Sequence, residues 1–114
     1  MSYEPLILFF FLLFYIMISV KLSKSDNPKK KYKVIVVKEG GRKKTIHFGS
    51  AGMSDYTKHK DPERKKRYIA RHRKRENWND PYTAGFWSRW LLWDEPTIKA
   101  SKSSISRRHN IKFI

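Results

Sequence analysis

The sequence predicts an α+β protein with an N-terminal single-pass transmembrane helix followed by a small basic domain. Three observations lead to this prediction. Residues 6–20 form an uncharged apolar run, residues 32–48 alternate β-branched and polar side chains around a Gly-Gly pair, and residues 61–76 and 84–93 carry helix-start signals or helical periodicity. With 114 residues, the chain has room for one modest domain.

The first segment, residues 1–22, is predicted to be a short membrane anchor. Residues 6–20 (LILFFFLLFYIMISV) span roughly 22 Å at about 1.5 Å per residue, short of the roughly 30 Å hydrocarbon core. Tyr3 at the interface and Lys21, with its ammonium extended outward, would complete the span. A cleaved signal peptide is an alternative, although its first residues should be basic and here carry only Glu4. A buried helix of a globular protein is a second alternative.

The charge distribution predicts which side of the membrane holds the rest of the chain. The chain has 26 Lys and Arg against 10 Asp and Glu, a net charge of +16, and every Lys and Arg follows Val20. The positive-inside rule therefore places the C-terminal domain on the cytoplasmic side. Residues 23–31 (SKSDNPKKK) are polar and end in three lysines, which predicts a basic linker near anionic headgroups. The absence of cysteine excludes disulfides, thiolate nucleophiles and Cys-based zinc sites.

Residues 32–100 are predicted to form the small basic α+β domain. Residues 32–38 and 44–48 read as two strands of a β-hairpin around Gly40-Gly41. Because a lone hairpin is marginally stable in water, it must pack against helices. The Asp61-Pro62-Glu63 sequence places an N-cap, a first-turn proline and an early carboxylate in the order that starts a helix, predicted to run to about Glu76.

A second, aromatic helix is predicted at residues 84–93 (AGFWSRWLLW). It places five large apolar side chains on one broad face: Phe86, Trp87, Trp90, Leu91 and Trp93. Residues 94–96 (DEP) would end this helix. Residues 101–114 are rich in serine and basic side chains without clear periodicity, so we expect a disordered basic tail.

The basic helix is the candidate anion-binding or partner-binding site. On a helical wheel, five cations fall within one arc of about 100°, and they are Arg64, Arg67, Arg71, Lys74 and Arg75. Such a face would bind phosphates in a largely sequence-neutral way, with affinity falling steeply with salt. The anion could equally be lipid or an acidic protein, and a merely solvated charged face is the simpler alternative. No helix-turn-helix, zinc finger or other base-reading motif is visible.

The tryptophans allow two interpretations. Trp87, Trp90 and Trp93 could form most of a small core, or they could contact a partner protein. An enzyme is disfavoured, because His47, Asp55, His59, Asp61 and His72 would make a site only in a fold that the sequence does not dictate. We expect no catalytic residues, no metal, no cofactor and no small-molecule substrate.

Two stretches of the sequence carry a family resemblance. Residues 47–77 (HFGSAGMSDYTKHKDPERKKRYIARHRKREN), followed by residues 83–101 (TAGFWSRWLLWDEPTIKAS), resemble a small uncharacterised family of large nucleocytoplasmic DNA viruses and some algae. The resemblance covers about residues 32–101 and leaves out the predicted anchor and tail. It implies a viral setting and no activity.

The anchor, the basic domain and this resemblance together predict a non-enzymatic minor capsid or virion protein. It would link the membrane beneath a capsid to capsid proteins, with its domain facing the cytoplasm on host membranes during assembly. Trp87, Trp90, Arg64, Arg67 and Arg71 would make the contacts. The alternative is a membrane-tethered, sequence-nonspecific nucleic-acid-binding protein that uses the five-cation face.

Overall fold

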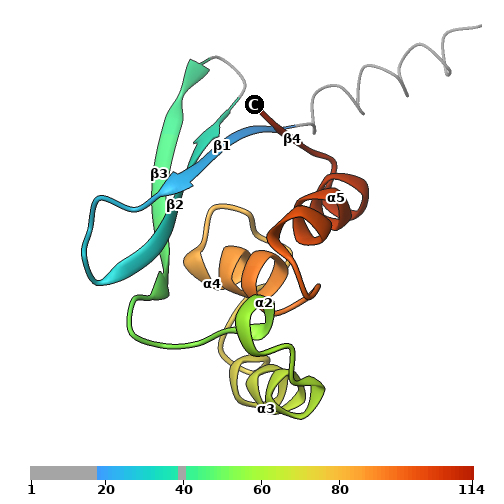
Figure 1. The fold of residues 1–114 in the computed structure, drawn as a ribbon. Helices are drawn as coiled ribbons and strands as arrows, with labels where there is room; N and C mark the ends of the chain where they lie inside the picture. The colour runs from blue at the N-terminus through green and yellow to red at the C-terminus, as the bar shows by residue number, and fades with distance from the viewer. Residues whose placement is uncertain (1–17, 39–40) are drawn as a thin grey trace, which may run out of the picture.

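The computed structural model describes residues 18–38 and 41–114, which form one four-stranded sheet with helices on one side (Figure 1). The strands are β1 (Ile18–Lys24), β2 (Lys30–Val37), β3 (Lys43–Ser50) and β4 (Ile111–Phe113), in the spatial order β3-β2-β1-β4. β1 and β3 both run antiparallel to β2, whereas the short β4 runs parallel to β1. The first and last strands of the described chain are therefore neighbours.

Alternation along the strands creates the core face of the sheet. Val20 of β1 lies opposite Val36 of β2, Val34 of β2 lies opposite Ile46 of β3, and the three valines are completely buried. Ile111 of β4 lies beside Ile18 and extends the same apolar surface. A sheet with one apolar face needs a covering layer, which the helices supply.

In the described part of the chain, five helical elements lie between β3 and β4. They are α2 (Tyr56–His59), α3 (Pro62–His72), α4 (Ala84–Trp87), the π-helical turn η2 (Ser88–Leu92) and α5 (Ile98–His109). Thr83 and Thr97 cap α4 and α5 by accepting hydrogen bonds from backbone N–H groups three residues further on. Side chains from α4, η2 and α5 meet the sheet in one core, which includes Phe86, Trp87, Leu91, Leu92 and Ile105.

The predicted membrane anchor is corrected by the structure. Residues 1–17 lie outside the described residues, and residues 18–22 form most of β1 and not the end of a helix. Ile18, Val20 and Leu22 alternate with polar residues, the period of a strand, and all three contribute to the core. Within the described ranges, no helix combines the length and the apolar character needed to cross a bilayer.

The predicted linker, residues 23–31, is also ordered. It comprises the end of β1, a turn, and the first residues of β2, which makes a first hairpin before the predicted one. Within the turn, the Asn27 side chain accepts a hydrogen bond from the Lys29 backbone N–H at 3.0 Å, and the Lys30 N–H donates to the Asn27 carbonyl at 3.0 Å. Asparagine side-chain chemistry thus closes the turn.

The predicted disordered tail, residues 101–114, forms most of α5 and all of β4. The sequence hides this helix because two of its three buried residues, Ser101 and Ser104, are polar, and only Ile105 is apolar. The folded domain therefore extends beyond the predicted limits 32–100 on both sides.

Three predicted elements are present. Residues 32–48 contain the β2–β3 hairpin, and the basic helix α3 begins after Asp61 with Pro62 in its first turn. The predicted aromatic helix, residues 84–93, is present as α4 followed directly by the π-helical η2.

Candidate anion-binding site

Helix α3 is started by the residues that the sequence suggested. The Asp61 carboxylate accepts hydrogen bonds from the backbone N–H groups of Glu63 at 2.9 Å and Arg64 at 3.4 Å. Pro62 needs no hydrogen-bond acceptor for its nitrogen, and Glu63 places a negative charge at the positive end of the helix dipole. The helix ends at His72, one turn earlier than predicted.

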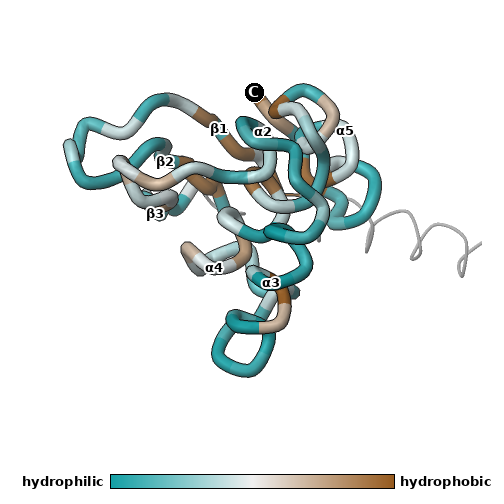
Figure 2. Tube along the Cα trace, turned by 60° about the horizontal axis from the view of Figure 1, so that its bottom comes forward, coloured by the Kyte–Doolittle hydropathy of each residue, from teal (hydrophilic) through white to brown (hydrophobic). Residues whose placement is uncertain are grey.

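The outer surface of α3 carries the predicted basic face, which we define as Arg64, Arg67, Arg71, Lys74 and Arg75. All five side chains are exposed; the first three lie on α3, and the last two lie in the turn that follows it. Across residues 18–38 and 41–114, the ion pairs involve Lys31, Lys33, His72 and Arg89 and none of these five. The basic face therefore keeps its charge available to an external anion. Figure 2 shows α3 projecting from the rest of the domain, mostly hydrophilic along its length.

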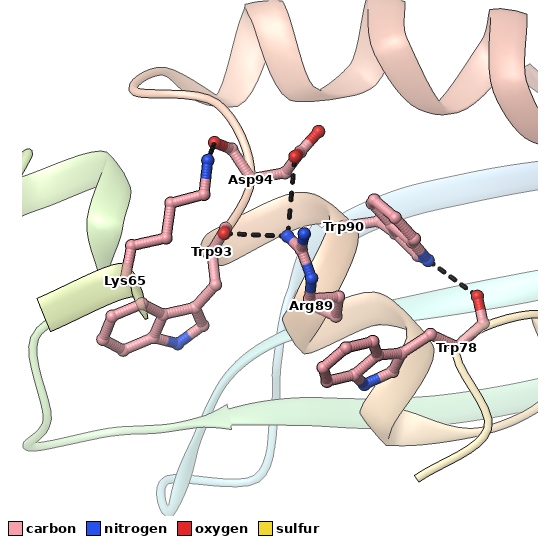
Figure 3. Close-up of polar contacts among 6 residues, drawn as sticks. All are labelled: Lys65, Trp78, Arg89, Trp90, Trp93 and Asp94. Carbon is pink, nitrogen blue, oxygen red and sulfur yellow. Dashed lines mark hydrogen bonds and ion pairs between the residues drawn. The ribbon is translucent and has the colours of Figure 1, made fainter. Parts of the chain in front are cut away.

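The side of α3 next to the basic face attaches the helix to the domain. The Tyr68 ring stacks on Trp93 at a centroid distance of 4.4 Å and an interplanar angle of 4°, and its other face covers the His72 ring at 4.2 Å. The Lys65 ammonium donates to the Asp94 carbonyl oxygen at 2.7 Å (Figure 3). Burial, followed by the nearby Glu76 carboxylate, raises the pKa of Tyr68 well above its usual value, so this hydroxyl stays protonated.

The segment that receives α3 is held by Arg89, which lies on η2. Its guanidinium donates to the Trp93 carbonyl oxygen at 2.9 Å and approaches the Asp94 carboxylate at 3.5 Å (Figure 3). The same group lies over the rings of Trp90 at 4.4 Å and Trp78 at 5.3 Å. Burial lowers the pKa of Arg89, and the Asp94 carboxylate opposes that shift. This network fixes the chain that follows η2, and with it the position of α3.

The three tryptophans predicted to contact a partner belong to the interior network. Trp87 is completely buried and donates through Nε1 to the Pro81 carbonyl at 2.8 Å, so it cannot touch a partner while the domain is folded. Trp90 donates to the Trp78 carbonyl at 2.7 Å, and Trp93 stacks on Tyr68; both are half-buried. The core interpretation of these residues describes the structure better than the contact interpretation.

A cleft of about 320 Å³ lies beside the basic face, between α3, the β2–β3 hairpin and the α4–η2 segment. Its walls include the buried residues Phe48, Asp55, Tyr68 and Leu92. Arg71 also lines the cleft, so one residue of the basic face borders both surfaces.

Asp55 is the most deeply buried charge near this cleft, at 1% exposure. It caps α2 by accepting from the Thr57 backbone N–H at 2.9 Å, and it accepts a second hydrogen bond from the Thr57 hydroxyl. The Lys31 ammonium lies 2.6 Å from the other carboxylate oxygen. The buried charge is therefore neutralised within the domain.

The side chains weighed for catalysis are engaged separately. His59 accepts at Nδ1 from the Asp61 backbone N–H at 3.0 Å and packs on Trp93, and burial lowers its pKa. His47 forms a 2.7 Å hydrogen bond to Ser25, while His72 lies 3.4 Å from Glu76. No three His, Asp or Glu side chains in the described part of the chain are grouped to hold a metal ion.

Sequence reasoning missed the attachment of α3 and the cleft. Lys65, Tyr68 and His72 are spaced three and four residues apart on the side of the helix next to the basic face, a signal that could have identified them as its inner surface. The roles of Lys31 and Asp55 depend on contacts between distant segments, which no local spacing reveals.

The fold and this surface define a small α+β domain with a projecting basic helix and an adjacent cleft. Residues 20–72, from β1 to the end of α3, match the model of a family of unknown function (DUF5754). No curated protein and no solved structure matches the chain. The resemblance to an uncharacterised family is thus confirmed in this coarse form, and the matched stretch includes the whole of α3.

Proposed function

We propose that this domain binds nucleic acid through the phosphate backbone, using the basic face of α3. The observation that carries the proposal is that five exposed cations on and after one projecting helix have no acidic partner among the described residues. Arg64 and Arg71 are seven residues apart, about 10 Å along the helix, a distance over which duplex DNA carries about six phosphates.

The exposed apolar surface favours nucleic acid over a membrane as the polyanion. Among the described residues, the exposed large hydrophobic side chains are Met53 and Ile114. Interfacial membrane helices bury a broad apolar face in the bilayer, whereas the apolar side of α3 is occupied by Tyr68 stacked on Trp93. Phosphate contacts alone require no such face.

The test measures the affinity of the full chain for a duplex of arbitrary sequence at several salt concentrations. Five phosphate contacts predict that log K falls with log salt with a slope of about −4.5. The triple variant Arg64→Gln, Arg67→Gln, Lys74→Gln should reduce the magnitude of that slope by about 2.7.

A matched control removes three exposed charges from the sheet through Lys24→Gln, Lys43→Gln and Lys112→Gln. This variant should retain most of the slope. Equal losses in the two triple variants would mean that binding follows net charge and not α3, and would refute the proposed interface. Stronger binding to vesicles of anionic lipid than to the duplex would also count against it.

A place in a virus particle and an origin in large DNA viruses or algae stay predictions based on the sequence resemblance. Of their original supports, the Trp87 contact is lost, and the described residues contain no helix able to cross a membrane. Mass spectrometry of purified particles of the source virus would test them: copies that stay with the capsid shell after detergent would support a shell role, and copies that fractionate with the genome would support the nucleic-acid role.

A further inference from the structure

We infer that the cleft beside α3 binds a phosphate monoester, the terminal phosphate of a nucleic-acid strand that lies along the basic face. This inference rests on the proposed function for the identity of the strand. The chemistry of the cleft is argued from its own residues.

One residue of the cleft lining, Tyr68, has an unpartnered hydroxyl. Tyr68 is 5% exposed, and its hydroxyl has no hydrogen-bond partner within the described structure. Both faces of the ring are covered, by Trp93 and by His72, and Tyr68 is one of the residues that line the cleft. A buried hydroxyl without a partner is unfavourable, and a ligand oxygen in the cleft would remove that cost. Because the hydroxyl stays protonated, it can donate to an anion.

The charges that line the cleft favour an anion. Lys30 and Arg71 line it from two different elements, and neither takes part in an ion pair within the described residues. Of the two acidic residues of the lining, Asp55 is neutralised by Lys31. Glu76 accepts from the Trp78 indole N–H at 3.1 Å and lies 3.4 Å from His72. These two contacts do not cancel the charge of Glu76, because the indole is neutral and the histidine is charged only when protonated. The lining therefore holds three cations, Lys30, Lys31 and Arg71, against two carboxylates, and its net charge is positive by one.

The size and the position of the cleft favour the end of a strand. A volume of about 320 Å³ lies at the lower end of small-ligand sites and is too small to admit a duplex. A strand can therefore enter only by its end. A terminal monoester carries a charge of about −1.5 to −2 and three acceptor oxygens, which suits two cations and a hydroxyl better than an internal diester does. Arg71 borders both the cleft and the basic face, so an end in the cleft would be continuous with a strand on α3.

The experiment compares two oligonucleotides of the same sequence, one with a 5′-phosphate and one with a 5′-hydroxyl, in binding to the full chain. The phosphorylated end should bind about tenfold more tightly, the effect of one added hydrogen bond to a charged group. Tyr68→Phe keeps the stack on Trp93 and removes only the hydroxyl, so it should lower the preference well below tenfold and leave the part that Lys30 and Arg71 supply. Tyr82→Phe changes a tyrosine outside the cleft lining and should retain the preference.

Thermal unfolding supplies a second measurement that does not need nucleic acid. Inorganic phosphate and a nucleoside 5′-monophosphate should raise the Tm of the wild-type chain, and should raise that of Tyr68→Phe less. Without ligand, Tyr68→Phe should unfold at the same or a higher temperature, because it removes an unpaired buried hydroxyl.

The outcomes separate the two proposals. Equal affinity for both oligonucleotides would overturn the cleft inference and leave backbone binding by α3 standing. Stabilisation by the nucleoside monophosphate without any preference for phosphorylated ends would overturn the strand-end assignment in favour of a free nucleotide. If neither oligonucleotide bound, the proposed function would be overturned. If phosphate also failed to raise the Tm, the assignment of the cleft as a phosphate site would be overturned as well.

Discussion

Replacing Gly49 with alanine should destabilise the domain more than the same change at Gly41 or Gly52. Gly49 has a φ of +78°, and a Cβ built there would lie 2.8 Å from Leu92 Cδ1 and 3.3 Å from Lys31 Cβ. Gly41 has a similar φ of +82° but nothing within 4 Å of such a Cβ, and Gly52 has neither the positive φ nor a close neighbour. The three glycines therefore separate backbone strain from steric contact.

The expected magnitudes follow from these differences. Gly52→Ala should be neutral or stabilising by up to about 1 kcal/mol, because it only restricts the unfolded chain. Gly41→Ala should cost about 1–2 kcal/mol from the positive φ. Gly49→Ala adds to this strain an overpacking cost of about 1–3 kcal/mol, because Leu92 is 2% exposed and belongs to the core.

Urea unfolding followed by tryptophan fluorescence, together with Tm measurements, would provide the comparison. For a domain of this size, each kcal/mol corresponds to roughly 4–8 °C in Tm. The midpoint should fall in the order Gly52→Ala, Gly41→Ala, Gly49→Ala, with similar m-values. Equal losses for Gly41→Ala and Gly49→Ala would refute the argument that β3 must approach Leu92 too closely for any side chain.

Three further predictions concern burial and charge. Ile105→Ala should cost about 2–5 kcal/mol, measured by the same unfolding assay, since Ile105 is 1% exposed; a cost near zero would mean that α5 does not pack on the sheet. Asp55→Asn and Lys31→Met should each cost about 3 kcal/mol, and the double variant should cost less than their sum by about 1–3 kcal/mol; strict additivity would rule out a coupled ion pair. Burial lowers the pKa of His59 and of His109 in the folded chain below the ordinary value of 6.5. Just below pH 6.5 the unfolded chain therefore binds more protons than the folded chain, and the free energy of unfolding should fall as the pH drops. The fall is at most about 1.4 kcal/mol per pH unit for each histidine, and it ends once the pH has passed the folded-state pKa. His109→Gln should flatten this dependence in a Tm series from pH 7.5 to 5, and an unchanged slope would contradict the assignment.

The fold was predictable from sequence where local chemistry dominates. The β2–β3 hairpin follows from alternation around glycines, and the start of α3 follows from Asp61 and Pro62. Strand β1 was not predicted, because averaging hydropathy over a window that includes the preceding apolar run gives a high value that indicates a membrane segment. The alternation of apolar and polar residues from Ile18 to Lys24 is nevertheless that of a strand. Helix α5 was hidden because serine at Ser101 and Ser104 allows close packing without an apolar signal.

One part of the candidate site was predictable from the sequence, and the other part was not. The basic face was predictable, because residues spaced three and four apart on one helix share a surface whatever the tertiary structure. The cleft was not, since it requires α3, the β2–β3 hairpin and α4–η2 to meet. Trp87 was predicted as a possible partner contact because composition alone cannot separate a buried indole from an exposed one. In the structure its side chain is completely buried.

The pairing of β4 with β1 has a consequence for how the domain is made. β1 lies inside the sheet only once β4 is in place, yet almost the whole described chain separates Ile18 from its neighbour Ile111. During synthesis, β1, β2 and β3 can form a meander early, while one edge of β1 stays unpaired until α5 and β4 have been made. Contacts between distant residues form slowly, and an unpaired edge invites association with other chains. A nascent chain of this protein should therefore be most prone to aggregation, and most dependent on chaperones, in the interval before residue 111 is available.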